Sequence, residues 1–363
     1  MKTIYYNIFF TFLIPFFCLA NNGDLNGKYT KEKSLKKEFS VNSDALLKIS
    51  NDYGNLDITS WDQDKIVMEI IIKVSGDDEE KVIEKLKSID VEFESSSQMV
   101  SAKTIFDKDK KSWWDKITGG WGNNLSMKIN YKVKMPVTNK VDLNNDYGSI
   151  TLDKIEGDAK INCDYGQIIL GELLSDNNYI NIDYTNSSSI KRMKKGTINA
   201  DYSDYEVGSA DYIDLVADYT QSKFDNVKEL KYNCDYGGMK IGDAGSVDGD
   251  GDYMDMKINS ISEKLNINSD YGSIRVNSLK STVREVTIKT DYSGVELNIE
   301  PDFNFDFVIK TSYGGINVDS DFQIMKQSKN NNSKDYQGYH GQKNTGNSIN
   351  VTSSYGGVKI KKN

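Results

Sequence analysis

The strongest regularity in this chain is a motif built on tyrosine, in which Asp-Tyr-Gly or a close variant returns every 17 to 21 residues. Apolar residues stand four positions before the tyrosine and three and five positions after it, as between Ile161 and Leu170. A fixed period of this length is typical of repeat architectures. The tyrosines of the series are Tyr147, Tyr165, Tyr184, Tyr202, Tyr219, Tyr236, Tyr253, Tyr271, Tyr292 and Tyr313, with Tyr53 and Tyr355 as outliers.

Period-two alternation on both sides of the motif predicts two short strands that meet at a corner. The tyrosine shares the parity of the apolar positions, so we expect its side chain to face inward or to fill the corner. The aspartate before it must face outward, because an unpaired buried carboxylate is strongly unfavourable. Gly166 and its equivalents are then expected to let the chain change direction.

These patterns predict an all-β fold, namely a single-chain β-solenoid (β-helix) of about 17–21 residues per coil with a small α+β cap at the N-terminal end. No apolar stripe with the helical period of 3.6 residues survives across a repeat, which excludes a helical solenoid. Coils stacked at about 4.8 Å would give ten of them a length of roughly 50 Å. We expect a right-handed winding.

Two segments break the repeat. The insert at 62–140 contains a strand-like stretch, KIVMEIIIKV, and a helix-like stretch, DDEEKVIEKLKSI, with Val82, Ile83, Leu86 and Ile89 on one face. We interpret the insert as part of a cap that covers the open end of the repeats. The second break, 326–346, is polar, and we expect a mobile, disordered loop there.

The chain therefore divides into six parts. They are a signal peptide (1–20), a flexible N-terminal segment (21–38), a cap with the first coil and the insert (39–140), the solenoid repeats (141–325), the polar loop (326–346) and the last coil (347–363).

The first twenty residues carry the signals of export. Lys2 gives a positive start, an apolar run follows, and Ala20 is the expected cleavage position. Lipidation at Cys18 is the alternative, although Phe16 and Phe17 stand where small residues are expected. No later apolar run is long enough to span a bilayer. We therefore expect a periplasmic, outer-membrane-surface or extracellular protein.

Composition narrows the partners and the redox chemistry. The formal net charge is −9, and an acidic chain is a poor ligand for nucleic acid. Export permits disulfides. Cys163 and Cys234 nevertheless occupy the same motif position four coils apart, roughly 19 Å at the spacing of stacked strands. A disulfide needs Cα atoms within about 7 Å, so we expect two free, buried thiols.

The order of motifs resembles a bacterial family. The resemblance rests on four stretches: Asn51-Asp52-Tyr53-Gly54, ITSWD at 58–62, INYKVKMPV at 129–137 and Asp146-Tyr147-Gly148-Ser149-Ile150. The chain is similar over roughly 40–363 to the "putative adhesin" family with β-strand repeats, a domain of unknown function, and to the head domains of auto-transporter adhesins. The resemblance implies a β-solenoid and an envelope location, and it supplies no catalytic residue.

The outward positions form columns of like residues, with aspartate one position before the tyrosine and largely asparagine three positions before it. We call these two columns the Asn/Asp strip. A column of carboxylates about 4.8 Å apart offers oxygen ligands for Ca²⁺ or hydrogen bonds for a glycan. The alternative is structural, with each aspartate accepting backbone N–H groups in an Asx-type turn. Serine replaces aspartate at Ser312 and Ser354, which favours the structural alternative, and we expect no firm cofactor. The aspartates of the column are Asp146, Asp164, Asp183, Asp201, Asp218, Asp235, Asp252 and Asp270.

Two other features are candidate contact sites. Lys223, Lys240, Lys257 and Arg275 form a basic stripe four positions after the tyrosine, which either balances charge or binds an anionic glycan. Trp113, Trp114 and Trp121 fall within nine residues of the insert. Such aromatics either stack on sugars or contact a membrane surface, or they pack against the cap.

No catalytic constellation stands out, because the acids are periodic and the sole histidine, His340, has no evident partner in the polar segment. We therefore expect a non-enzymatic, adhesin-like structural or binding module whose partner is an envelope or surface glycan or protein. The alternative is a carbohydrate-binding or carbohydrate-active β-helix that uses the Asn/Asp strip or the tryptophan loop.

Overall fold

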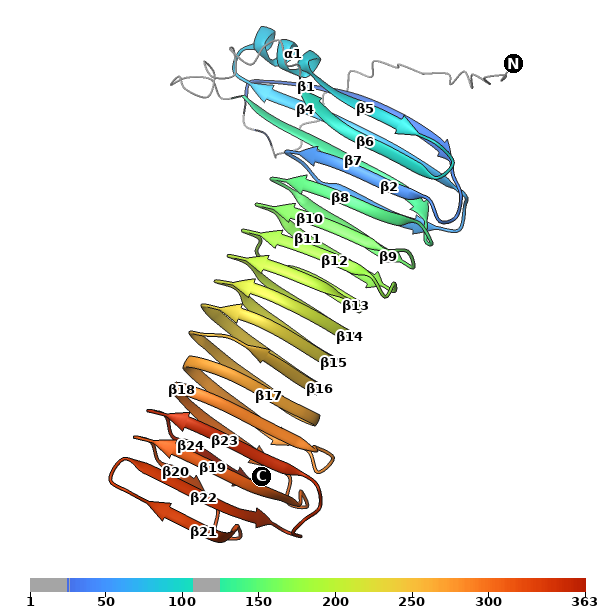
Figure 1. Ribbon diagram of the computed structural model, residues 1–363. Coiled ribbons are helices and arrows are strands. Elements are labelled where there is room, and N and C mark those ends of the chain that lie inside the picture. Colours follow the sequence, from blue (N-terminus) through green and yellow to red (C-terminus); the bar gives the residue numbers. More distant parts are fainter. Residues whose placement is uncertain (1–24, 26, 107–124) are drawn as a thin grey trace, which may run out of the picture.

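The computed structural model describes residues 25, 27–106 and 125–363 (Figure 1). Nearly all regular structure in these ranges is β-strand, so the prediction of an all-β fold is confirmed. The described strands join into one 24-stranded sheet, which Figure 1 shows as a long stack of strands. The sheet is mixed, since its pairings are parallel through the repeats and partly antiparallel at both ends.

In the first repeats one strand precedes the tyrosine and another follows it. From Ser188 onward a single strand runs from one tyrosine towards the next, and at Tyr271 and Tyr292 it runs through the tyrosine. Each of these strands pairs in parallel with the equivalent strands of the neighbouring repeats. For example, Ile161 lies opposite Leu143 on one side and Ile180 on the other. The strands are β8 (Lys140–Asp146), β9 (Ser149–Ile155), β10 (Ala159–Asp164), β11 (Gln167–Leu173), β12 (Asn178–Asp183), β13 (Ser188–Asp201), β14 (Asp204–Asp218), β15 (Gln221–Asp235), β16 (Gly237–Asp250), β17 (Met254–Leu279) and β18 (Glu285–Ile299).

The core lies between the strands before and after the tyrosines and runs through the stack. Every second side chain of β10 is buried, as the period-two pattern predicts, and β14 alternates in the same way at both ends, with steps of three residues in its middle. Leu143, Ile161, Ile180, Ile198 and Leu215 stand in one register column, and each is fully buried. Apolar columns of this kind remove the same positions of every repeat from water, which is the main favourable contribution to folding.

The N-terminal end is a cap of longer strands. Its elements are β1 (Tyr29–Ser40), β2 (Leu46–Asp52), β3 (Leu56–Trp61), β4 (Lys65–Gly76), α1 (Glu79–Ser88), β5 (Ile89–Ser95), β6 (Met99–Phe106) and β7 (Ser126–Pro136). The expectation of a flexible segment at 21–38 is wrong from Tyr29 onward, because β1 pairs antiparallel with the whole of β4. Leu35 and Phe39 of β1 pack against the core, so this strand is bound through side chains as well as backbone.

The predicted helix is present as α1, which Figure 1 places at the extreme end of the cap. The Asp78 carboxylate accepts the backbone N–H groups of Glu80 and Lys81, an N-cap that stabilises the first turn. The predicted apolar face is partly wrong: Val82 is buried, but Ile83 is exposed and Lys85 is buried in its place. The Lys85 ammonium lies 5.0 Å from the centre of the Phe106 ring, and burial lowers the pKa of Lys85 to about 8.

The C-terminal end departs from sequence order. Its strands are β19 (Phe305–Ser312), β20 (Ile316–Val318), β21 (Gln323–Lys329), β22 (Ser333–His340), β23 (Ser348–Ser354) and β24 (Val358–Lys362). Strand β23 pairs with β18 on one side and with β19 on the other. The segment predicted as the last coil, 347–363, is therefore inserted before the coil of Tyr313, and the coil of Tyr313 lies further out.

The expectation of a disordered loop at 326–346 is wrong. Strands β21 and β22 form an antiparallel hairpin, and β22 also pairs with β19. Only two side chains of β22, Tyr336 and His340, are buried, so the segment reads as polar although it is ordered. Within the described ranges, no helix is long and apolar enough to cross a membrane.

Candidate functional site: a tyrosine ladder and a groove

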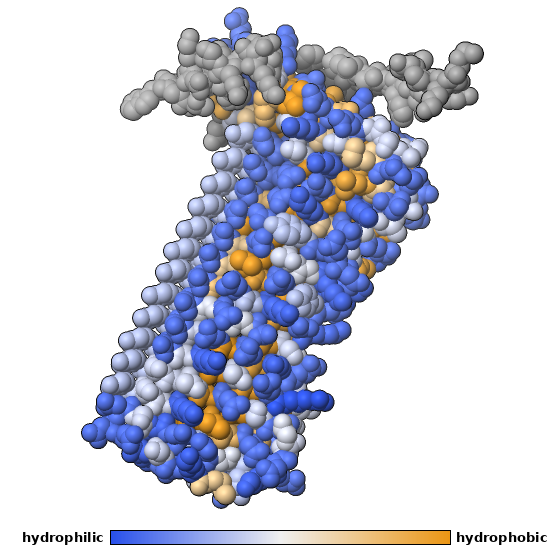
Figure 2. All heavy atoms as spheres, viewed as in Figure 1, coloured by the Kyte–Doolittle hydropathy of each residue, from blue (hydrophilic) through white to orange (hydrophobic). Residues whose placement is uncertain are grey.

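The twelve motif tyrosines lie on the surface and form the most regular feature of the molecule. Their side chains are 40–59% exposed, so of the two expectations the inward orientation is wrong, whereas a position at the corner agrees with the structure. Each adopts a left-handed backbone conformation, with φ between 49° and 63°. This conformation turns the chain and directs the ring outward despite the inward parity of the position. Figure 2 shows a regular row of pale side chains along one edge of the molecule, consistent with the intermediate hydropathy of tyrosine.

The rings stack on one another without interruption, and we call this array the tyrosine ladder. Neighbouring ring centroids are 4.6–5.3 Å apart, and the rings are within 8° of parallel. The order of the rings along the ladder differs from their order in the sequence at one point, because Tyr355 stacks between Tyr292 and Tyr313. At the cap end, the edge of Phe106 meets Tyr53. With eleven steps of about 4.8 Å, the ladder is roughly 50 Å long.

The left-handed tyrosine also replaces glycine as the residue that turns the chain. The glycines that follow it have no positive φ, and Ser203, Thr220 and Met254 stand at that position in other repeats. The proposed role of Gly166 in the change of direction is therefore wrong. A Cβ at Gly166 would instead overlap the carbonyl oxygen of Gly148 in the neighbouring coil, so close approach of backbones explains this glycine.

The aspartate column tightens the contact between coils. The Asp235 carboxylate accepts the backbone N–H of Asp252 at 2.8 Å, and the Asp270 carboxylate accepts that of Asp291 at 2.8 Å. These bonds join neighbouring repeats, whereas the predicted Asx-type turn would have kept them within one repeat. Burial, followed by repulsion from adjacent aspartates, raises the pKa of Asp52 and Asp164. Within the described residues, no three acidic, histidine or cysteine side chains gather in a way that could hold a metal ion.

The ladder also changes the acidity of its own phenols. The pKa of Tyr165, Tyr202, Tyr236 and Tyr271 lies above the ordinary tyrosine value. Loss of hydration is the largest cause, and the neighbouring tyrosines and aspartates add repulsion against a phenolate. These four phenols are therefore neutral at physiological pH, with the aspartate column beside them.

The basic stripe is partly paired. Lys223 forms ion pairs with Glu206 at 3.1 Å and Asp225 at 3.2 Å, and Arg275 forms one with Glu296 at 3.3 Å. Lys240 and Lys257 lie in register between them and form no ion pair within the described part of the chain. The stripe therefore consists of two neutralised ends with two solvated lysines between them.

The remaining predicted residues fall into three groups. Trp113, Trp114 and Trp121 lie outside the described residues, as does the predicted signal peptide. Cys163 and Cys234 are buried thiols, and burial raises the pKa of each to about 12. His340 does have partners: its Nδ1 lies 2.6 Å from the Phe303 carbonyl oxygen, and its ring packs on Phe305 and Phe322.

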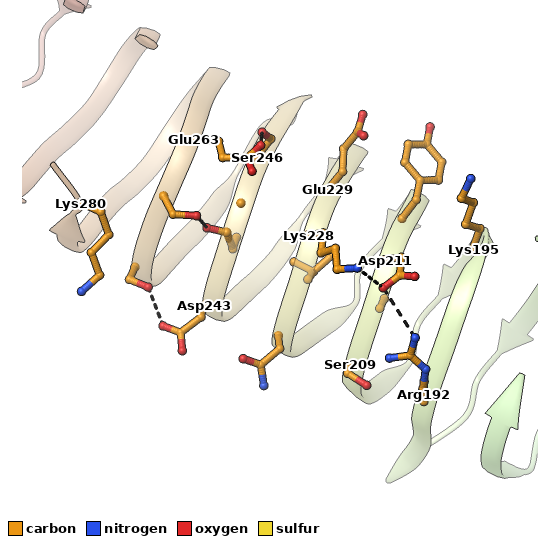
Figure 3. Close-up of a pocket in the computed structure, with 18 residues that line it drawn as sticks. Arg192, Lys195, Ser209, Asp211, Lys228, Glu229, Asp243, Ser246, Glu263 and Lys280 are labelled. Atoms are coloured by element: carbon orange, nitrogen blue, oxygen red, sulfur yellow. Dashed lines mark hydrogen bonds and ion pairs between the residues drawn. The ribbon is translucent and has the colours of Figure 1, made fainter. Parts of the chain in front are cut away.

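A groove that the sequence reasoning missed lies seven to ten positions after the tyrosine, at the other turn of the repeat. It has a volume of about 860 Å³ and crosses β14, β15, β16 and β17 (Figure 3). Arg192 and Lys228 both point at Asp211, at 3.7 Å and 3.0 Å. The sequence does carry a signal for it: the spacing falls to 17 residues in three successive repeats between Tyr202 and Tyr253.

Comparison with known proteins gives only distant likenesses. No family model matches the chain, and no curated protein matches it. A "putative cell adhesion protein" from Clostridium sporogenes is 14% identical, with a TM-score of 0.19, over 92% of this chain and all of the other. A "putative adhesin" from Bacteroides fragilis is 13% identical, with a TM-score of 0.25, over 91% and 97% of the two chains. A "putative lipid binding protein" from Parabacteroides distasonis is 10% identical, with a TM-score of 0.31, over 91% and 96%.

Proposed function

We propose that this protein is an exported, non-enzymatic, adhesin-like module of the bacterial cell envelope, built as a β-solenoid that displays a binding face. The parallel pairing of each repeat with the next, in register, supports the solenoid interpretation. The observation that carries the functional part is the tyrosine ladder, because it places a continuous aromatic strip on the surface of a rigid stack.

The ladder has the chemistry of a contact surface. Stacking occupies the ring faces, so the ring edges and hydroxyl groups are what a partner meets. Tyrosine is enriched at protein interfaces because it combines a large apolar ring with a hydrogen-bonding hydroxyl. Exposed aromatic side chains gathered into one strip mark interaction sites. A partner that spans several coils would make the same contact at each of them.

The absence of an enzymatic role is supported by how the reactive groups are used. Column aspartates accept backbone N–H groups of the next coil, and Asp211 is paired with two cations. His340 is packed among phenylalanines with its Nδ1 on a carbonyl oxygen. These groups have structural partners, whereas a general acid or base needs access to a substrate.

Export is tested by expressing the full chain, and a variant without residues 1–20, in a bacterium. If the full chain is on the cell surface, protease added to intact cells should degrade it; if it is periplasmic, protease should degrade it after the outer membrane is permeabilised. In both cases the shortened chain should be spared. A full chain that fractionates with the cytoplasm would overturn the envelope location.

Binding is tested with the purified chain on immobilised mucin, collagen and fibronectin. We expect saturable binding to at least one of them, reduced at least about fivefold by Tyr202→Phe/Tyr219→Phe/Tyr236→Phe, which keeps the stack and removes three hydroxyl groups. Tyr179→Phe, an exposed tyrosine outside the ladder, is the matched control. Binding to none of the surfaces, or turnover of a polysaccharide by the chain, would contradict the proposal.

A further inference from the structure

The groove in Figure 3 crosses the three shortest repeats of the series. Three repeats of 17 residues lie between Tyr202 and Tyr253, and the repeats on both sides have 18. The shorter coils supply the floor through small residues such as Ser209, Ala210 and Ala244. The extra residue of the following repeat lies at this turn, opposite Gly245, whereas that of the preceding repeat lies between Tyr184 and Ser188.

One wall of the groove is made by a β-bulge. The register between β16 and β17 shifts where Gly245 lies opposite two residues, Ser262 and Glu263. A bulge of two residues against one bends the strand and redirects its side chains, and bulges are common beside binding sites. The Glu263 carboxylate lies 3.4 Å from the Ser246 hydroxyl across the bulge. The irregularity therefore falls among the residues that line the groove.

The charges of the groove largely cancel within it. Asp211 is shared by Arg192 and Lys228, and the Asp243 carboxylate accepts the Ser260 hydroxyl at 2.5 Å. Lys195 and Lys280 at the margins pair with Asp176 and Glu300. A polyanion or a lipid headgroup would need a surplus of positive charge that this lining does not offer.

Hydrogen-bonding capacity remains on both sides of the groove, with Glu229 and Ser209 towards opposite edges in Figure 3. Ser209, Asn226 and Glu229 form no side-chain hydrogen bond or ion pair within the described part of the chain, and Asn226 and Glu229 are exposed. Tyr212 lies opposite Glu229 in the register, and the Lys231 ammonium lies 5.9 Å from the centre of its ring. The backbone is not available, because β14, β15 and β16 each pair on both sides. A peptide added as an extra strand needs a free edge, so this groove does not favour one.

We propose that the groove binds a neutral linear oligosaccharide that lies along the stack, across β14 to β17. Hydroxyl groups of such a ligand match the mixed donors and acceptors of Asn226, Glu229 and Ser209, and a ligand without charge suits the balanced lining. One sugar ring is similar in length to one coil spacing, so successive rings meet successive repeats. The inference deepens the proposed function, on which it rests, by naming a ligand class and its site.

The experiment uses isothermal titration of the purified chain with neutral hexasaccharides: β-1,4-glucose, β-1,4-N-acetylglucosamine, β-1,3-glucose, α-1,4-glucose and β-1,4-xylose. We expect at least one to bind with a Kd of roughly 10 μM to 1 mM, the range of a few polar contacts. Asn226→Ala/Glu229→Ala should weaken that affinity at least about tenfold. Asn233→Ala, an exposed asparagine on the same strand outside the groove, should leave it unchanged.

The outcomes separate this inference from the proposed function. Failure of every hexasaccharide to bind, or binding that Asn226→Ala/Glu229→Ala leaves unchanged, would overturn the groove as the site. Unaltered circular dichroism melting of the double variant shows that it folds. A chain that binds mucin, collagen or fibronectin through the ladder but binds no hexasaccharide would retain the proposed function and lose only this inference.

Discussion

Tyrosine at a left-handed backbone position is unusual, since β-carbon crowding makes this conformation unfavourable by roughly 1–2 kcal/mol per residue. Each ring of the ladder contacts a ring above and a ring below, except at the two ends. An aromatic pair contributes about 0.5–1.5 kcal/mol beyond its area burial. Because each contact is shared by two rings, the ladder supplies about one contact per tyrosine, which offsets part of the backbone strain. The same residue thus closes each repeat and joins it to the next.

Substitutions at Tyr219 separate ring from hydroxyl. Its centroid lies 4.8 Å from those of Tyr202 and Tyr236. Tyr219→Phe should leave the urea unfolding midpoint nearly unchanged. Tyr219→Asn, which suits the left-handed conformation but removes two ring contacts, should lower the free energy of unfolding by about 1–3 kcal/mol. Equal losses in the two variants would show that the hydroxyl, and not stacking, supplies the stabilisation.

The aspartate column makes a second prediction at the residue scale. The Asp235 carboxylate accepts the Asp252 N–H at 2.8 Å and lies in a column of like charges. Asp235→Asn keeps an acceptor oxygen and removes a charge, so thermal stability should be equal or higher. Asp235→Ala removes the acceptor and should cost about 0.5–1.5 kcal/mol. Calorimetric melting of both variants measures these stabilities. A larger loss of stability in Asp235→Asn than in Asp235→Ala would mean that the negative charge itself is needed.

At the scale of the strand, neighbouring coils approach so closely that glycine is required at some outward positions and not at others. A Cβ at Gly171 in β11 would overlap the carbonyl oxygen of Asp153 in the coil below. A Cβ at Gly294 in β18 would meet nothing within 4 Å. Both glycines occupy strands and neither has a positive φ, so they form a matched pair. The difference between them lies in the neighbouring coil.

Gly171→Ala and Gly294→Ala should therefore change stability in opposite directions. Overlap with backbone at Gly171 forces the coils apart, and overpacking of this kind typically costs about 1–3 kcal/mol. Alanine at Gly294 fits without strain and should stabilise by about 0.4–1 kcal/mol, because it restricts the unfolded chain. Urea titration of both variants tests the coil spacing, and a loss at Gly294 as large as at Gly171 would contradict it.

The sequence predicted the repeated part well because its signals are local. Alternation around Tyr165 or Tyr236 places inward and outward residues correctly, and the acids before Val82 predicted α1. Three features depend on contacts that no local pattern carries. The tyrosine rings point outward because φ is positive at each of them. Tyr355 takes its place in the ladder because β23 pairs with two distant strands, β18 and β19. Strand β22 is ordered because His340 and Tyr336 are buried. The groove required a comparison of repeat lengths.

At the scale of the whole molecule, the phenols of the ladder act together on stability. In the folded protein the pKa of Tyr165, Tyr202, Tyr236 and Tyr271 is raised, and in the unfolded chain it returns to the ordinary value near 10. Above that pH the unfolded chain loses protons that the folded protein keeps, so the folded state binds more protons. Stability is then fully present below about pH 10 and falls as the pH rises through the folded pKa values.

We expect the melting temperature to be nearly constant from about pH 7 to 9 and to fall steeply above about pH 10. Buried Tyr131, Cys163 and Cys234, whose pKa values are each raised to about 12, act in the same direction. Tyr202→Phe/Tyr219→Phe/Tyr236→Phe keeps the rings and removes two phenols of raised pKa, those of Tyr202 and Tyr236, so its alkaline loss should be smaller than that of the unsubstituted chain. Circular dichroism melting, with phenolate absorbance followed in parallel, measures both quantities. An alkaline loss that is identical in the two proteins would mean that the buried groups, and not the ladder, cause it.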